Sequence, residues 1–279
     1  MKLKKFLTVV LAGIMAVSLL AACGAAPQTD NNESASSQTE TSSDLEYIKD
    51  KGKMTIGITL FAPMNYNENG ELTGFETEFA KAVCEKLGVE ADFQEINWDS
   101  KEIELNSKNI DCIWNGMTIT DERRENMSIS TSYMHNKQVM VVKAENVDKY
   151  KDSVSGAGIV AEAGSTGEEL AQEDEFFASG KYTGVDSQAK ALMDVASGTS
   201  DIAIVDYVTS IGSIGEGTDF AGLKVIEEKE FALDEYGVAF RKGSDMTAEV
   251  NKAMKELYDD GTLAEIAGKY KLGELLMEQ

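Results

Sequence analysis

Hydrophobic and polar positions alternate from about residue 44 onward in a repeating order of strand and helix. Residues 54–60 (MTIGITL) form a short apolar run that is typical of a buried strand. Residues 76–87 predict a helix, because the apolar side chains recur at every fourth position: Phe75, Phe79, Val83 and Leu87. Gly88 ends this helix, and residues 89–96 predict a second strand. The order indicates an α/β fold.

A third strand and a short helix follow. Residues 110–114 (IDCIW) predict a buried strand, and Asn115-Gly116 breaks it. Thr120 has the character of a helix N-cap, with acids in the next two positions. Alternating strands and helices predict a mainly parallel sheet flanked by helices, with a ligand crevice beyond the carboxyl ends of its strands. We therefore expect Phe61, Trp98 and the turn at residues 115–118 to surround one crevice.

A second alternating unit occupies the middle of the chain. Residues 158–161 predict a strand, and Thr166 with Glu169 fits a capping box at the start of the next helix. A glycine-flanked helix start offers backbone N–H groups to an anion, although such turns are more often ordinary caps. Residues 202–205 predict a buried strand that ends at Asp206, either a crevice acid or a turn residue. Two helices close the chain, the second capped by Thr262.

The first 22 residues predict a signal peptide, because a basic start precedes a short apolar run. The sequence Leu-Ala-Ala-Cys resembles a bacterial lipobox, which implies cleavage before Cys23 and acylation of its thiol with a fatty acid such as palmitate. Residues 23–43 are rich in Ala, Ser, Thr and Asn and predict a flexible, lipid-anchored linker. We expect the protein on the outer face of the bacterial cytoplasmic membrane.

The net charge and the cysteine content limit the possible functions further. The formal net charge of −23 over 279 residues argues against binding to nucleic acid. Cys84 and Cys112 could form a disulfide in an exported protein, but we expect two buried free thiols. One histidine, His135, cannot build a metal site alone, so we expect no metal and no cofactor.

Arg123 and Arg124 are unusual for this chain, whose only other arginine is Arg241. They lie close to a predicted helix start, whereas cations are stabilised at helix C-termini. An exposed surface pair is the ordinary explanation for two adjacent arginines. Since a guanidinium matches a carboxylate with two parallel hydrogen bonds, we instead predict that one of them clamps a carboxylate.

Several of these segments together resemble the extracellular solute-binding proteins of polar amino-acid ABC transporters. The resemblance lies in their order along the chain: Phe61-Ala62-Pro63-Met64, Gly74-Phe75-Glu76, Trp98-Asp99, Ile110-Asp111, Thr118-Ile119-Thr120-x-x-Arg123, Gly164-Ser165-Thr166, Asp206 and Tyr236-Gly237-Val238-Ala239. It implies a two-lobed, periplasmic-binding-protein-like fold with two hinge crossings. The first lobe would comprise residues 44–137 and 232–279, and the second residues 138–231.

The resemblance also implies a role for each site residue. Arg123 would bind the α-carboxylate of an amino acid, together with Thr118 and the N–H of Thr166. Asp206 and the carbonyl of Gly116 would bind the α-ammonium. Phe61 and Trp98 would flank the ligand side chain, and Ser165 and Asn115 complete the expected set. The partners would be an ABC permease and its ATPase, and the protein would be a monomer.

Departures from the family pattern bear on specificity. Ile58 stands where relatives that bind basic amino acids often carry an acid, which slightly favours uncharged polar or sulfur-containing ligands. The same fold hosts enzymes of the prephenate or arogenate dehydratase type, the alternative function. Glu76 and Asp99 are the only acids that sequence reasoning offers for catalysis, and both fit structural roles, so we expect no enzyme activity.

Overall fold

The structure is a computed structural model that describes residues 43–229, 231 and 233–279. The predicted signal peptide, the lipobox with Cys23 and nearly all of the predicted linker lie outside the described residues. From Ser43 onward, the described chain contains two large sheets, each of which forms the centre of one lobe.

The first lobe is built on a five-stranded sheet in the order β4-β1-β5-β13-β6. Strands β1, β4 and β5 are parallel to one another, as the alternating sequence predicts, whereas β13 is antiparallel to both of its neighbours. The sheet is therefore mixed rather than mainly parallel, because β13 reaches it from the opposite direction after the chain has built the second lobe. The strands are Lys53–Ile58 (β1), Glu90–Glu95 (β4), Cys112–Ile113 (β5), Met127–Ile129 (β6) and Ala239–Arg241 (β13).

Helices from both ends of the chain belong to this lobe. Helix α2 buries Phe75, Phe79 and Val83, the face that the fourfold spacing predicts. Phe79 packs edge-on against Trp114 with ring centroids 5.1 Å apart, and such aromatic packing adds to the stabilisation from burial. The helices are Asp44–Lys51 (α1), Phe75–Leu87 (α2), Lys101–Asn106 (α3), Asp121–Asn126 (α4), Met246–Asp259 (α9) and Thr262–Lys269 (α10).

The second lobe contains a six-stranded sheet. Its path is β11-β7-β10-β8-β9, and β12 pairs with β7 beside that path. Strands β8, β9 and β10 are parallel, whereas β7 is antiparallel to each of its three partners, so this sheet is mixed as well. The strands are Met134–Lys143 (β7), Gly158–Glu162 (β8), Lys181–Val185 (β9), Ile202–Asp206 (β10), Leu223–Val225 (β11) and Leu233–Tyr236 (β12). The helices are Val147–Tyr150 (α5), Thr166–Glu173 (α6), Gln188–Ser197 (α7) and Tyr207–Ser213 (α8).

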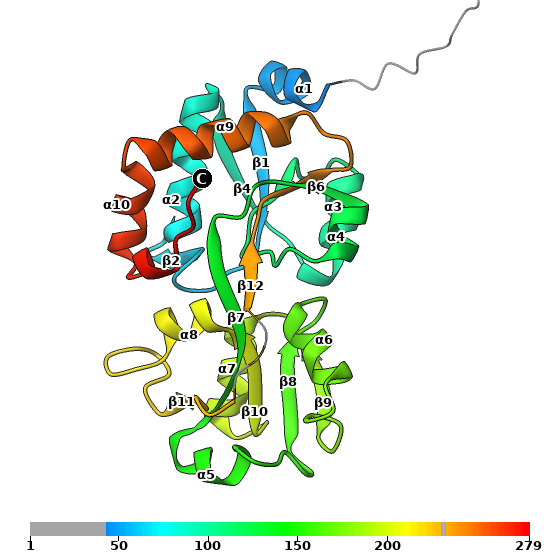
Figure 1. The fold of residues 1–279 in the computed structure, drawn as a ribbon, viewed down its shortest axis with the longest axis vertical. Coiled ribbons are helices and arrows are strands. Elements are labelled where there is room, and N and C mark those ends of the chain that lie inside the picture. Colours follow the sequence, from blue (N-terminus) through cyan, green and yellow to red (C-terminus); the bar gives the residue numbers. More distant parts are fainter. Residues whose placement is uncertain (1–42, 230, 232) are drawn as a thin grey trace, which may run out of the picture. The chain divides into compact units, whose positions relative to one another are not determined.

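Strands β7 and β12 join the two lobes, and they run side by side in Figure 1. The first half of β7 pairs with β12, from Met134 opposite Tyr236 to Lys137 opposite Leu233. Its second half pairs with β10 in the middle of the second sheet. Within the described part of the chain, these paired strands alone connect the two sheets, so the two predicted hinge crossings occur there.

Two predicted helix caps are wrong. Helix α6 is capped by Ser165, whose Oγ accepts from the backbone N–H of Glu168, and the Glu168 carboxylate accepts from Gly164 N at 2.6 Å. The cap therefore lies one residue before the predicted Thr166. Helix α10 is preceded by Gly261 in the left-handed conformation and has no side-chain cap, so Thr262 is its first residue rather than its cap.

Other features of the described residues bear on the sequence predictions. Cys84 and Cys112 are free and buried in the core of the first lobe, as expected. The described residues contain no cluster of His, Cys, Asp and Glu side chains that could hold a metal ion. Within the same part of the chain, every helix is too short or too polar to cross a membrane.

Candidate functional site

A narrow cavity lies where the residues that follow β4 and β5 in the first lobe face the carboxyl ends of β8 and β10 in the second. Both lobes contribute side chains to its wall, which is the crevice that the strand order predicts. The lining residues are Trp98, Asn115, Gly116, Thr118, Arg123, Glu162, Ser165, Thr166, Gln188 and Asp206. Every predicted site residue except Phe61 is among them.

Arg123 is buried at 6% exposure, whereas its neighbour Arg124 is exposed. Its Nη1 donates to the carbonyl oxygen of Thr118 at 2.8 Å, and its Nη2 donates to that of Gly164, across the cavity, at 3.4 Å. Burial lowers the pKa of Arg123 while nearby carboxylates oppose that shift, and an arginine remains cationic in either case. The chain thus holds a fixed cation at the cavity.

The sequence-based argument that Arg123 is misplaced near a helix N-terminus is wrong. Helix α4 has only six residues, so Arg123 and Arg124 lie in its last turn, where cations are stabilised. The Thr120 cap is confirmed, since its Oγ1 accepts from the N–H of Arg123 at 3.1 Å. Arg123 stands out because of its burial and not because of its position in the helix.

The turn at Gly116 is held by a buried acid. Oε1 of Glu76 accepts from the N–H of Gly116 at 2.7 Å and from the Tyr133 hydroxyl, and its Oε2 accepts from Asn65 at 2.8 Å. Burial raises the pKa of Glu76 to about 7, although these donors favour its ionised form. Glu76 therefore fixes the loop at Gly116, which is the structural role expected for it from the sequence.

Asn115 lines the cavity, but its side chain serves the framework of the first lobe. Its Oδ1 accepts from Thr59 N at 2.8 Å and from Asn65 Nδ2 at 3.1 Å. Its Nδ2 donates to Thr59 Oγ1 at 2.7 Å. These hydrogen bonds fix the side chain of Asn115, which thereby orients the turn that follows β5.

The second lobe supplies the N-terminus of α6 to the opposite wall. Thr166 Oγ1 lies 3.4 Å from Thr118 Oγ1 and accepts from Gln138 Nε2 at 3.0 Å. The positive end of a helix dipole favours an anion at this place. Thr166, Thr118 and Arg123 together form the polar groups that suit a carboxylate.

Asp206 ends β10 and is buried at 6% exposure. Three side-chain amides donate to its carboxylate, from Asn136 at 2.8 Å, Gln138 at 2.5 Å and Gln188. Burial raises the pKa of Asp206, and the three amides favour the ionised form. These donors fix an acid at the wall opposite Arg123, and sequence reasoning did not foresee them.

The two predicted aromatic residues occupy different places. Trp98 is 4% exposed and lines the cavity, with the Nζ of Lys101 4.8 Å from its ring centroid. Phe61 lies beneath Gly116, where an added Cβ would come within 2.9 Å of the Phe61 ring. Phe61 therefore supports the floor of the cavity and is outside the set of residues that line it.

Glu162 and Gln188 line the cavity and were missed by sequence reasoning. Gln188 positions Asp206, because its Oε1 accepts from Asp206 N at 2.9 Å while its amide nitrogen donates to the carboxylate. Glu162 follows the apolar run Gly-Ile-Val-Ala. That is the same signal, an acid ending a buried strand, by which Asp206 was selected, and it could have identified Glu162.

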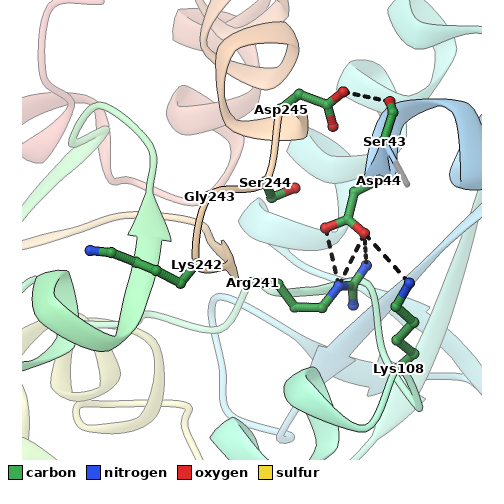
Figure 2. Close-up of a pocket in the computed structure, with 8 residues that line it drawn as sticks. All are labelled: Ser43, Asp44, Lys108, Arg241, Lys242, Gly243, Ser244 and Asp245. Atoms are coloured by element: carbon green, nitrogen blue, oxygen red, sulfur yellow. Dashed lines mark hydrogen bonds and ion pairs between the residues drawn. The ribbon is translucent and has the colours of Figure 1, made fainter. Parts of the chain in front are cut away.

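Figure 2 shows a different hollow, where α1 meets the end of β13. Two of its side chains form an ion pair, with Arg241 Nη2 3.0 Å from Asp44, and Ser43 donates a hydrogen bond to Asp245. None of the predicted site residues lines it. This hollow joins the start of the described chain to the first sheet, and the cavity between the lobes remains the candidate site.

The fold and this cavity together define a binding protein with two lobes. The family model of the bacterial extracellular solute-binding proteins, family 3, matches residues 54–274. The chain therefore belongs to the bacterial extracellular solute-binding proteins of family 3.

Relatives with known roles match nearly the whole chain. It is 32% identical over 269 residues to the L-cystine-binding protein TcyA of Bacillus subtilis (strain 168), covering 92% of this chain and 94% of TcyA. It is 30% identical over 270 residues to the L-cystine-binding protein TcyJ of Escherichia coli (strain K12), covering 93% and 94%. Among solved structures, an ABC uptake transporter substrate binding protein from Streptococcus pneumoniae with bound histidine matches with a TM-score of 0.76 and 28% identity, covering 85% of this chain and 99% of that one. The two-lobed α/β fold is thereby confirmed.

Proposed function

We propose that this protein captures an amino acid between its lobes and delivers it to an ABC permease, whose ATPase supplies the energy for transport. One observation carries the proposal: a buried cation, Arg123, and a buried anion, Asp206, line the same cavity. An amino acid carries the complementary pair of charges. The names of the relatives support the same class of ligand, since they include L-cystine-binding proteins and a protein with bound histidine.

The proposed contacts follow from the geometry of the two walls. Arg123, the Thr118 hydroxyl and the N–H of Thr166 would hold the α-carboxylate. Asp206 and the Gly116 carbonyl would hold the α-ammonium, with Trp98 beside the ligand side chain. Burial of a zwitterion needs a partner for each charge, because an unpaired charge in a closed site is costly.

Closure of the lobes about β7 and β12 would trap the ligand. Contacts that span the lobes support this mechanism: Lys101 Nζ donates to the Gly164 carbonyl at 2.9 Å, and Arg123 donates to the same oxygen. Both donors come from the first lobe and the acceptor from the second. We propose that the first lobe comprises residues 44–137 and 232–279, that the second comprises residues 138–231, and that the protein acts as a monomer.

Cys23 would anchor the protein by its lipid to the outer face of the cytoplasmic membrane, with residues 23–43 as a tether. Cys23→Ser should move the protein from the membrane fraction to the soluble fraction of cells that express the full chain. Membrane association that is unchanged in this variant would overturn the anchor and leave the ligand site untouched.

Calorimetry with the twenty standard amino acids and L-cystine tests the binding function. We expect saturable binding of one chemical group of amino acids, together with a decrease in the radius of gyration measured by X-ray scattering. Mass spectrometry of the recovered ligand should show it unchanged, as a binding protein requires. Chemical conversion of the ligand would instead favour an enzyme of the dehydratase type, and the absence of binding to any amino acid would refute the proposal.

A further inference from the structure

One carboxylate of the cavity wall, that of Glu162, contacts neither the α-carboxylate nor the α-ammonium of the ligand in the proposed set of contacts. Glu162 ends β8, lines the cavity and is 3% exposed. Its Oε1 has no hydrogen-bond partner among the described residues. Buried polar atoms in proteins are nearly always hydrogen-bonded, so an unpartnered carboxylate oxygen inside a binding cavity indicates a group that the ligand itself satisfies.

The cavity wall carries one more acidic side chain than the two charges of a neutral amino acid would engage. Arg123 contributes one positive charge, and Asp206 and Glu162 contribute two acids. A zwitterion brings no net charge and would engage Arg123 and Asp206 alone. A ligand with one more positive charge would match the third group, and burying a carboxylate without such a partner is unfavourable.

Lys101 is the nearby cation that could have balanced Glu162 from within the protein. Its Nζ instead donates to two carbonyl oxygens, those of Trp98 at 3.3 Å and Gly164 at 2.9 Å. Its charge favours the ionised form of Glu162 from a distance. The unpartnered Oε1 of Glu162 therefore remains available to a ligand.

The protonation of Glu162 agrees with a missing partner. The pKa of Glu162 is raised to about 8, mainly by burial and also by the charge of Asp206, while Lys101 and Thr59 act in the opposite direction. At pH 7 the empty site would hold Glu162 mostly protonated. A cation placed beside it would reverse this preference and expel the proton.

We propose that Glu162 determines specificity by binding a second positively charged nitrogen group of the ligand, so that the preferred ligands are amino acids with two cationic nitrogens. This inference rests on the proposed function. It differs from the preference for uncharged polar or sulfur-containing ligands that Ile58 suggested in that β8 supplies an acid where β1 does not, although cystine would satisfy both. Two kinds of ligand share this chemistry: a basic side chain such as that of arginine, and the second α-ammonium of a double amino acid such as cystine.

The test is calorimetry of L-arginine, L-cystine and L-glutamine with the wild-type protein and with Glu162→Gln. Glu145→Gln is the control, since Glu145 is an exposed acid of the second lobe outside the cavity. We expect Glu162→Gln to weaken binding of the preferred ligand, arginine or cystine, by at least about 30-fold, because it removes one partner of a buried charge pair. Glutamine should bind the wild-type protein more weakly, and Glu162→Gln should change that affinity less than about threefold.

Proton release gives a second readout that a merely structural residue would not alter. The heat of ligand binding at pH 7 should differ between phosphate and Tris buffers for the wild-type protein, since about one proton leaves Glu162 on binding and is taken up by the buffer. For Glu162→Gln the two buffers should give the same heat of binding. Arginine and cystine in the same experiment distinguish the two sources of the second nitrogen.

The outcomes separate this inference from the proposed function. Tightest binding of glutamine, with its affinity retained in Glu162→Gln, would overturn the role of Glu162 and leave the amino-acid function standing. An equal loss of affinity for all three ligands would also overturn it, since the residue would then only support the fold. Failure of the wild-type protein to bind any amino acid would refute the function itself.

Discussion

The guanidinium of Arg123 donates to the carbonyl oxygen of Thr118 at 2.8 Å, five residues back along the chain. The loop that carries Arg123 therefore also holds its side chain in place, so the cation is oriented before a ligand arrives. Arg124, the next residue, is exposed and has no comparable role at the cavity among the described contacts.

Arg123→Ala should weaken amino-acid binding by about 30-fold to several thousand-fold, because loss of one partner of a buried pair costs about 2–5 kcal/mol. Arg123→Lys should recover only part of this loss, since an ammonium cannot form two parallel bonds to a carboxylate. Arg124→Ala is the matched control and should bind within about threefold of the wild-type protein. Calorimetry that found Arg124 to be the critical residue would reverse the assignment.

The order of the elements was predictable from the sequence. The fourfold spacing of Phe75, Phe79 and Val83 identified α2 and its buried face. The apolar runs identified the strands, and the rule for carboxyl ends of parallel strands brought residues far apart in sequence to one cavity. These features depend on local patterns, which a sequence displays directly.

The features that sequence patterns did not reveal depend on contacts between distant residues. Glu162 ends an apolar run in the sequence as Asp206 does, but its burial at the cavity is seen only in the structure. The antiparallel place of β13 in the first sheet depends on the path of the chain through the second lobe. Local hydroxyls at residues 165 and 166 could each cap α6, and only the geometry selects Ser165.

Gly116→Ala should destabilise the protein more than an ordinary glycine substitution in a turn. Gly116 has φ 54°, and an added Cβ would lie 2.9 Å from the buried Phe61 ring. We expect a loss of about 2–4 kcal/mol in the free energy of unfolding, from left-handed strain and overpacking together. Gly156→Ala is the control, because Gly156 has φ 72° but open space around its Cα. Urea unfolding should give about 1–2 kcal/mol for it, and equal losses would contradict the steric argument.

Cys84 and Cys112 should behave as free but unreactive thiols. Burial raises the pKa of Cys84 to about 12 and that of Cys112 well above its usual value, so little thiolate forms at neutral pH. In Cys23→Ser protein kept free of reductant, a thiol reagent should label neither cysteine quickly in the native state and both in urea. Absence of labelling in urea would show that the two cysteines are joined by a disulfide.

The unusual protonation of Glu162 should also be visible in the stability of the ligand-free protein. Its folded pKa of about 8 lies above the ordinary value of 4.5, so between these pH values the folded state binds a proton that the unfolded state has lost. Stability contributed by this group therefore falls as pH rises through that window. Glu162→Gln removes the effect, and its stability relative to the wild-type protein should rise by on the order of 2–3 kcal/mol between pH 5 and pH 7.5.

Urea unfolding at several pH values measures this difference. Glu76, whose pKa is raised to about 7, gives a slope of the same sign in both proteins, so it cancels in the comparison. Glu145→Gln should follow the wild-type curve, because Glu145 is exposed. Parallel curves for the wild-type protein and Glu162→Gln would show that Glu162 is already ionised in the empty site. A destabilised acid in the cavity is the expected consequence of a site built for a cation, since the ligand supplies the partner that the folded chain lacks.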